Sequence, residues 1–173
     1  IGIDGSFAPW VGNLINDINQ KIVIICPEDR EEEVVKRLAR VGYDHAVGYL
    51  KGSFSTWKNA NRTSDIIPQK EAIELTIDYD KDINVLDVRK LAEFSTEHIE
   101  NAQHYPLGNI FNQLGDIDSN KTYHVHCSGG YRSVIFISIL KSKDYHNFID
   151  VKGGYDAIKK IDVPKTDFVC PAT

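Results

Sequence analysis

The sequence predicts an α/β fold of two similar units, each a parallel sheet flanked by helices. Short apolar runs typical of strands alternate along the chain with segments whose apolar residues recur at helical spacing, and this alternation is typical of parallel sheets covered by helices. The chain also repeats itself, because residues 51–54 resemble residues 152–155, and residues 21–26 resemble residues 121–127. We therefore expect two copies of one supersecondary unit.

The first copy is expected to span residues 1–62. We predict helices over 7–14, 31–40 and 53–59 and strands over 22–25 and 46–50. The middle helix has the clearest pattern, because Val34, Val35 and Leu38 recur at helical spacing and its first turn is acidic, which favours the helix dipole. The counterparts of the second copy's first strand and helix would lie before Ile1. We therefore expect the first copy to be truncated at its N-terminus.

The second copy is expected to be complete over residues 63–163, followed by an irregular tail over 164–173. After a polar linker, Pro68 is predicted to begin a helix that ends near Thr76, because proline is favoured in the first turn of a helix. The remaining elements alternate regularly. We predict strands over 83–88, 102–105, 122–126 and 147–151, and helices over 90–96, 107–114, 131–143 and 155–160.

The composition is that of an ordinary globular protein, with 42% hydrophobic residues, enough for packed cores. The net charge is −5 and the basic residues are dispersed, so no nucleic-acid partner is expected. No apolar run approaches the ~20 residues of a membrane span, so no membrane partner is expected either. The sequence has three widely spaced cysteines, Cys26, Cys127 and Cys170, and this number and spacing make a disulfide framework unexpected. Free thiols suit a reducing compartment, so we expect the protein in the cytoplasm. Because the sequence has no methionine, we expect Ile1 not to be the natural start. The sequence leaves open whether the protein forms a homo-oligomer.

A candidate reactive loop joins the strand at 122–126 to the following helix. Its residues are Cys127, Ser128, Gly129, Gly130, Tyr131, Arg132 and Ser133. A glycine-containing loop that ends at a helix N-terminus directs backbone N–H groups and the positive end of the helix dipole to one point, here above the cysteine sulfur. These groups stabilise a thiolate, which is the nucleophilic form of cysteine. Cys127 is therefore predicted to be reactive.

This pattern, Cys-x-x-Gly-x-Arg-Ser at the end of a strand, resembles the active-site loop of rhodanese-type sulfurtransferases. Residues 84–89, 93–94 and 98–106 resemble that family's first strand, helix and second strand, and residues 151–155 resemble its last strand and glycine turn. Two positions depart from the family pattern. Glu97 stands where the family often has glycine, and Glu100-Asn101 stands where it often has Pro-Gly.

The resemblance implies a sulfurtransferase that needs no cofactor in this segment. The Cys127 thiolate would attack the sulfane sulfur of thiosulfate or of a low-molecular-weight persulfide. The resulting Cys127 persulfide would pass its outer sulfur to a thiol or to cyanide. The amides of residues 128–133 would stabilise the persulfide as an oxyanion hole stabilises oxygen, and Arg132 would brace the loop or attract the anionic donor.

Two alternatives stay open at this point. Cysteine phosphatases also surround an anion with a cysteine, a loop and an arginine. Their loop resembles Cys-x5-Arg, however, whereas four residues separate Cys127 from Arg132, which disfavours a tetrahedral phosphoryl group. A non-catalytic rhodanese-like interaction or regulatory module would keep the fold without the chemistry, and the intact loop argues against it.

The other two cysteines are not expected to be catalytic. Cys26 follows the matching strand of the first copy, but proline and two acids come after it. Proline removes a donor amide and acids disfavour a thiolate, so we expect the pKa of Cys26 to be raised. Cys170 lies in the tail and is interpreted as an incidental exposed thiol.

No metal is assigned to this segment. His124 and His126 alternate along one strand, so both point to one face of the sheet while Cys127 points to the other, and we expect the two histidines to be packed and hydrogen-bonded. Asp87 and Arg89 are expected to pair with each other at the end of the sheet.

A degenerate copy followed by an intact one resembles the C-terminal half of proteins that fuse a metallo-β-lactamase-type persulfide dioxygenase to tandem rhodanese domains. Residues 5–10 and 30–33 contribute to this resemblance. It implies an upstream domain of the same polypeptide as partner, and iron would belong to that domain. The rhodanese part would supply or process the dioxygenase's persulfide substrate, in sulfide detoxification.

Overall fold

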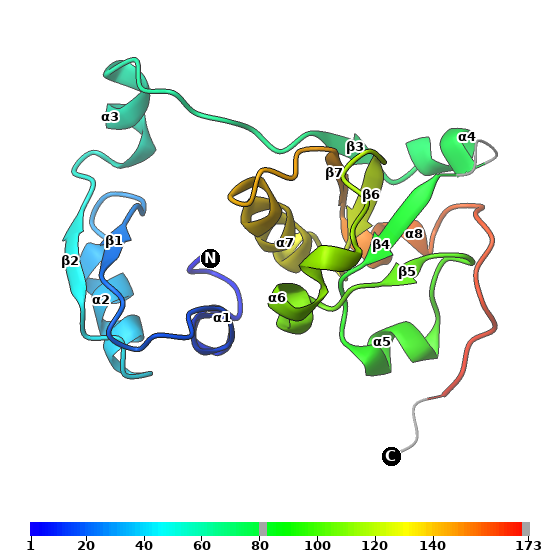
Figure 1. Ribbon diagram of the computed structural model, residues 1–173, viewed down its shortest axis with the longest axis horizontal. Coiled ribbons are helices and arrows are strands. Elements are labelled where there is room, and N and C mark those ends of the chain that lie inside the picture. Colours follow the sequence, from blue (N-terminus) through cyan, green and yellow to red (C-terminus); the bar gives the residue numbers. More distant parts are fainter. Residues whose placement is uncertain (80–82, 171–173) are drawn as a thin grey trace. The chain divides into compact units, whose positions relative to one another are not determined.

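The computed structural model describes residues 1–79 and 83–170. The chain forms two compact units, Ile1–Ile66 and Ile67–Thr173, and each is described by itself (Figure 1). The last three residues of the predicted tail, 171–173, lie outside the described residues.

The first unit is a small α/β unit in which two strands pair in parallel. Its elements are α1 (Phe7–Leu14), β1 (Ile22–Ile24), α2 (Glu31–Ala39), β2 (Ala46–Tyr49) and α3 (Ser53–Asn59), all within two residues of the predicted bounds. Val34 and Leu38 of α2 are buried against Phe7 and Val11 of α1 and Ile24 of β1. The apolar face of α2 therefore holds this unit together, as its helical spacing predicts.

The second unit is built around a parallel sheet which, among the described residues, has the strand order β3-β7-β6-β4-β5. The strands are β3 (Gln69–Glu71), β4 (Asn84–Asp87), β5 (Gln103–His104), β6 (Tyr123–His126) and β7 (Phe148–Lys152). The helices are α4 (Glu74–Tyr79), α5 (Leu91–Thr96), α6 (Ile110–Gln113), α7 (Tyr131–Lys141) and α8 (Gly154–Ile158). The predicted α/β class, with a parallel sheet flanked by helices, is confirmed.

Helices cover both faces of this sheet. In Figure 1, α6 and α7 lie on one side of the strands, and α4 and α8 lie on the other. On the second side, Val85 and Val151 of the sheet pack with Leu75 of α4 and Ile158 of α8. Each such fully buried aliphatic side chain contributes about 1.5–3 kcal/mol to the stability of the fold. Because β6 is the central strand, all of its residues are buried, and the loop that follows it starts from a rigid position.

The helix predicted to begin at Pro68 is wrong. Residues Gln69–Glu71 form β3, an edge strand parallel to β7, and the helix begins later, at Glu74. The carbonyl of Pro68 accepts a hydrogen bond of 2.9 Å from the N–H of Asp150. Proline is compatible with an edge strand because only one side of such a strand pairs, so its missing N–H costs nothing on the outer side.

The single helix predicted over 107–114 is also wrong in detail. The segment is a 3₁₀ turn (Leu107–Asn109), the short α6, and a second 3₁₀ turn (Leu114–Asp116). Leu107 and Ile110 are both buried and lie three residues apart, a spacing that suits the 3.0-residue repeat of a 3₁₀ helix.

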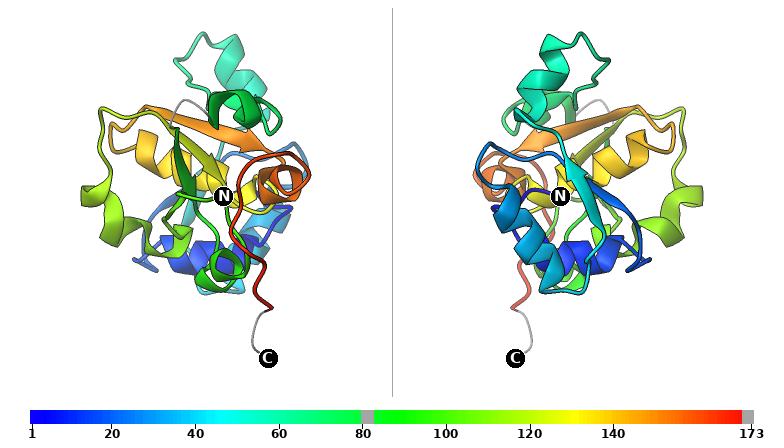
Figure 2. Two further views of the ribbon diagram at one scale, coloured as in Figure 1. Left: turned by 90° about the vertical axis from the view of Figure 1, so that its right-hand side faces the viewer. Right: turned by 90° about the vertical axis from the view of Figure 1, so that its left-hand side faces the viewer.

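The described part of the tail lies along the second unit. The N–H of Thr166 donates to the carbonyl of His98, and the N–H of Val169 donates to the carbonyl of Thr96 at the end of α5. Figure 2 shows this segment, in red, leaving α8 and running past α5. Across the described residues, every helix is too short or too polar to cross a bilayer.

Candidate functional site

The predicted reactive loop lies at the carboxyl end of β6, between that strand and α7. The carboxyl ends of parallel strands are where ligand sites form in α/β proteins. Cys127 follows the last strand residue and is 1% exposed. Gly130 has φ +102 and occupies the N-cap of α7. A left-handed residue at this point turns the chain sharply into the helix, and glycine adopts it without strain.

The loop presents hydrogen-bond donors to the cysteine sulfur. The N–H of Gly130 donates to Sγ of Cys127 at 3.1 Å, and the hydroxyl of Ser133, the third residue of α7, lies 3.7 Å from the same sulfur. The Gly130 N–H is placed to stabilise a negative charge on sulfur, whereas the Ser133 hydroxyl also lies 3.1 Å from the carbonyl of Gly130, which is its nearer acceptor. Of the other loop residues, Gly129 is exposed and Tyr131 is half-buried.

Arg132 is tied down by an acidic residue from α5. Its guanidinium binds both carboxylate oxygens of Glu93, at 2.6 and 2.7 Å, and also donates to the Ser128 hydroxyl at 2.8 Å. The Ser128 hydroxyl in turn donates to Glu93 at 2.7 Å. Partial burial tends to raise the pKa of Glu93, but the bonds from Arg132 and Ser128 lower it to about 2. The charged pair therefore persists at any ordinary pH, and Arg132 braces the loop.

Glu93 was not identified as a site residue from the sequence. It is the third residue of α5, and its side chain also accepts a hydrogen bond from the N–H of Lys90 at 3.1 Å. A glutamate at this place in a helix is a common cap for the helix N-terminus. This capping role by itself explains a glutamate at the third position of the helix. The sequence therefore gives no sign that Glu93 also contacts the loop that follows β6.

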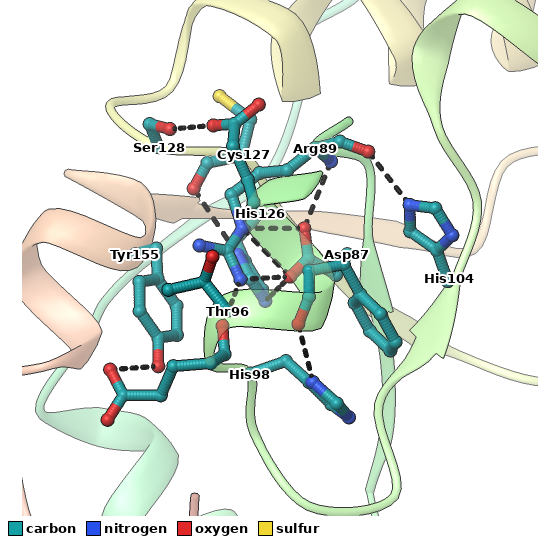
Figure 3. A network of polar contacts seen from close by, with 12 residues as sticks. Asp87, Arg89, Thr96, His98, His104, His126, Cys127, Ser128 and Tyr155 are labelled. Carbon is teal, nitrogen blue, oxygen red and sulfur yellow. Dashed lines mark hydrogen bonds and ion pairs between the residues drawn. The ribbon is translucent and has the colours of Figure 1, made fainter. Parts of the chain in front are cut away.

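A buried ion pair lies behind the loop, at the carboxyl end of β4. Arg89 donates to both carboxylate oxygens of Asp87, at distances between 2.6 and 3.0 Å. Asp87 is fully buried and Arg89 is 5% exposed. Figure 3 shows the pair beside Tyr155 and below Cys127. The expectation that these two residues pair at the end of the sheet is confirmed.

Comparison with known protein families shows to which family this chain belongs. Residues 69–161, slightly more than half of the chain, match the family described as the rhodanese-like domain. The chain belongs to the rhodanese-like family. The matched residues lie within the second unit and include the loop, the Asp87–Arg89 pair and α8.

Two named proteins resemble the rhodanese-like chain. "Putative sulfur carrier protein YrkF" of Bacillus subtilis is 26% identical over 126 residues, which cover 73% of this chain and 62% of that protein. A tRNA sulfurtransferase of Thermoplasma acidophilum is 32% identical over 76 residues, 42% of this chain and 15% of that protein. The chain thus spans less than two thirds of either relative.

Solved structures share the fold of the rhodanese-like unit. A rhodanese-related protein from Thermoplasma volcanium is 27% identical with a TM-score of 0.53, covering 57% of this chain and 97% of that one. A rhodanese-like domain protein from Staphylococcus aureus is 26% identical with a TM-score of 0.51, covering 53% and 91%. Nearly the whole of each of those domains is thus matched by part of this chain.

His124 and His126 of the rhodanese-like unit are buried, so the expectation that they are packed is confirmed. The Nε2 of His126 lies 3.8 Å from the carboxylate of Asp87, and its Nδ1 lies 3.3 Å from the carbonyl oxygen of Cys127. Burial lowers the pKa of His126, and the carboxylate of Asp87 offsets only part of this effect. Within the described residues, histidine, cysteine and acidic side chains form no cluster of three or more that could hold a metal ion.

The lowered pKa of His126 predicts acid sensitivity. The pKa of a histidine in an unfolded chain is about 6.5, so below this pH the unfolded chain binds a proton that the folded state does not bind. The stability contributed by neutral His126 is fully present above about pH 6.5 and is lost as the pH falls toward the lower folded-state pKa. Urea unfolding should give a smaller free energy of unfolding at about pH 5.5 than at about pH 7.5.

Two matched substitutions isolate this effect. His126→Asn should shrink the difference between the two pH values, whereas His146→Asn, at an exposed position, should leave it unchanged. An undiminished difference in the His126 variant would assign the acid sensitivity to other groups.

The first unit places Cys26 at the end of β1 without a comparable loop. Pro27 follows it, and α2 begins at Glu31. Burial raises the pKa of the Cys26 thiol and the carboxylate of Glu31 raises it further, while Arg30 opposes the rise. The expected direction is therefore confirmed, although burial rather than the neighbouring acids is its largest cause. Cys26, Cys127 and Cys170 are free thiols, and Cys170 is exposed.

Proposed function

We propose that the protein is a rhodanese-type sulfurtransferase that carries a sulfane sulfur on Cys127. The membership of the rhodanese-like family, together with relatives named as a sulfur carrier and a sulfurtransferase, supports sulfur transfer in general. The observation that carries the proposal for this chain is the geometry at Sγ of Cys127, which receives the Gly130 N–H at 3.1 Å beside the Ser133 hydroxyl.

The proposed reaction is a double displacement. The Cys127 thiolate attacks the outer sulfur of thiosulfate or of a low-molecular-weight persulfide; the donor's S–S bond breaks, and its electron pair leaves with sulfite or with the donor's thiolate. An acceptor thiolate or cyanide then attacks the outer sulfur of the Cys127 persulfide, and Cys127 leaves as the thiolate. No net oxidation occurs within the protein, so the cycle requires no cofactor.

The loop residues have separate tasks in this proposal. The backbone of residues 128–133 surrounds the persulfide, and the negative charge on its terminal sulfur is stabilised by N–H donors as in an oxyanion hole. Arg132 acts by holding the loop in shape, because its guanidinium is bonded to Glu93 and Ser128. The bonds of Arg132 favour this bracing role over attraction of the donor.

Intact-mass spectrometry tests the proposal. After incubation with thiosulfate or a low-molecular-weight persulfide, the protein should gain one sulfur, and Cys127→Ser should gain none. Cys26→Ser is the matched control, since it removes the thiol at the equivalent strand end; its transfer rate should stay within about twofold of the parent. Persulfidation that survives Cys127→Ser refutes the assignment. Absence of any transfer by the folded parent protein supports a non-catalytic interaction module instead.

We also propose that the chain works as the C-terminal part of a longer cytoplasmic polypeptide with tandem rhodanese-like units and an upstream metallo-β-lactamase-type domain. Within its described residues the first unit pairs only β1 with β2, which correspond in the repeat to β6 and β7. The counterparts of β4 and β3 would come from additional chain or another subunit. In this arrangement the upstream domain holds iron and the rhodanese-like part supplies or processes its persulfide, in sulfide detoxification.

Mass and metal content of the native protein test this arrangement. The purified native polypeptide should be much longer than 173 residues and should contain bound iron. A native polypeptide of this length, free of iron and of any associated fragment, contradicts the fusion while leaving the proposed chemistry of Cys127 untouched.

A further inference from the structure

The first turn of α8 lies directly against the backbone of the reactive loop. The N–H of Tyr155 donates to the carbonyl of Cys127 at 2.7 Å, and the N–H of Asp156 donates to the carbonyl of Ser128 at 2.9 Å. Gly154 approaches so closely that a Cβ added there would lie 2.4 Å from the Cys127 carbonyl oxygen. The two carbonyls are therefore held toward α8.

Because a peptide group is planar, the hydrogen bonds from α8 to the two carbonyls also orient the N–H groups of the same peptides. The carbonyl of Cys127 and the N–H of Ser128 belong to one peptide group, as do the carbonyl of Ser128 and the N–H of Gly129. Both peptides are trans, so each N–H points opposite to its carbonyl. With the carbonyls bonded to α8, the N–H groups of Ser128 and Gly129 point away from α8, and two amides of the proposed anion cradle are fixed in direction.

The side chain of Tyr155 is itself held on several sides. Its hydroxyl donates to the carboxylate of Glu97 at 2.8 Å. The guanidinium of Arg89 lies over its ring, 3.9 Å from the centroid, and also donates to the backbone carbonyl of Glu97 at 2.7 Å. Figure 3 shows Tyr155 inside this network, and its ring centroid lies 5.9 Å from that of His126. The ring cannot shift without breaking these contacts.

We propose that Glu97 and Tyr155 are positioning residues of the sulfur-transfer site. Their hydrogen bond holds the start of α8 on the carbonyls of Cys127 and Ser128, and so keeps the N–H groups of Ser128 and Gly129 fixed in direction within the proposed anion cradle. The inference rests on the proposed function. It assigns a role to Glu97, which lies outside the loop motif, at a position where the family pattern often has glycine.

Three substitutions separate positioning from general stability. Tyr155→Phe removes the hydroxyl but keeps the ring under Arg89, and Glu97→Ala removes the acceptor. Each should lower kcat for persulfidation by about three- to tenfold with KM nearly unchanged, the effect of losing one net hydrogen bond. Glu97→Gln keeps an acceptor oxygen and should stay within about twofold of the parent. Because the first two changes delete the same bond, the double variant should be no slower than either single one.

Alkylation of Cys127 by iodoacetamide provides a readout that does not depend on sulfur transfer. Its rate at about pH 7 should fall by the same factor in Tyr155→Phe and Glu97→Ala, since fewer aligned amides stabilise the thiolate. Tyr145→Phe is the matched control, because it deletes a hydroxyl bonded to the Leu114 carbonyl elsewhere in the unit; it should change neither rate.

The outcomes distinguish this inference from the proposed function. If the folded Tyr155→Phe variant keeps the parent's kcat and alkylation rate, or if the losses in the double variant add, the positioning role is refuted. If the parent moves no sulfur at all, the proposed function fails, and the alkylation rates still decide whether Glu97 and Tyr155 orient the loop.

Discussion

Replacing Asp87 with alanine is expected to lower the free energy of unfolding of the second unit by about 3–5 kcal/mol. The reason is that Arg89, which is 5% exposed, would keep its charge in the interior without the carboxylate that binds it at 2.6–3.0 Å. Breaking a buried pair from one side is far more costly than losing a surface pair. Urea unfolding followed by circular dichroism would measure the loss.

An exposed aspartate provides the control for this prediction. The carboxylate of Asp118 accepts hydrogen bonds from the backbone and side chain of the neighbouring Asn120. Asp118→Ala should therefore change the free energy of unfolding by less than about 1 kcal/mol. A loss of similar size in the two variants would show that the Asp87–Arg89 pair does not stabilise the fold.

The largest expected effect on rate, short of removing Cys127, comes from Glu93→Ala. Without Glu93, Arg132 loses both of its carboxylate bonds and Ser128 loses its acceptor. Hydrogen bonds between charged groups contribute roughly 1.5–3 kcal/mol each. If the loop loses about this much transition-state stabilisation because it is no longer held in shape, the rate falls by about 10- to 100-fold. We expect the loss in kcat for persulfidation, measured by intact mass against time.

The first unit supplies a matched control for Glu93. Glu33 also binds arginines through both carboxylate oxygens, at 2.9 Å to Arg30 and 2.7 Å to Arg37. Glu33→Ala therefore removes a similar pair of ionic bonds away from the reactive loop, and the rate should remain near the parent's. Equal losses in the two variants would mean that Glu93 acts on stability alone.

The sequence by itself determined the elements whose cause is local. The helical spacing of Val34 and Leu38 predicts α2, and the apolar run before Cys127 predicts β6, because an isolated helix face or a buried strand is specified by its own side chains. The loop after β6 was predictable for the same reason: its glycine at φ +102 and its place before a helix are properties of consecutive residues.

Only the tertiary structure decided the features that join distant residues. The chain enters β3 at Pro68 because β7 offers an edge to pair with, although the local signal favours a helix start. Glu93 lies 39 residues before Arg132, and Glu97 lies 58 residues before Tyr155. Each of these contacts depends on where the sheet places α5, α7 and α8. The sequence predicts Cys127 as the reactive residue, and packing decides which side chains hold its loop in position.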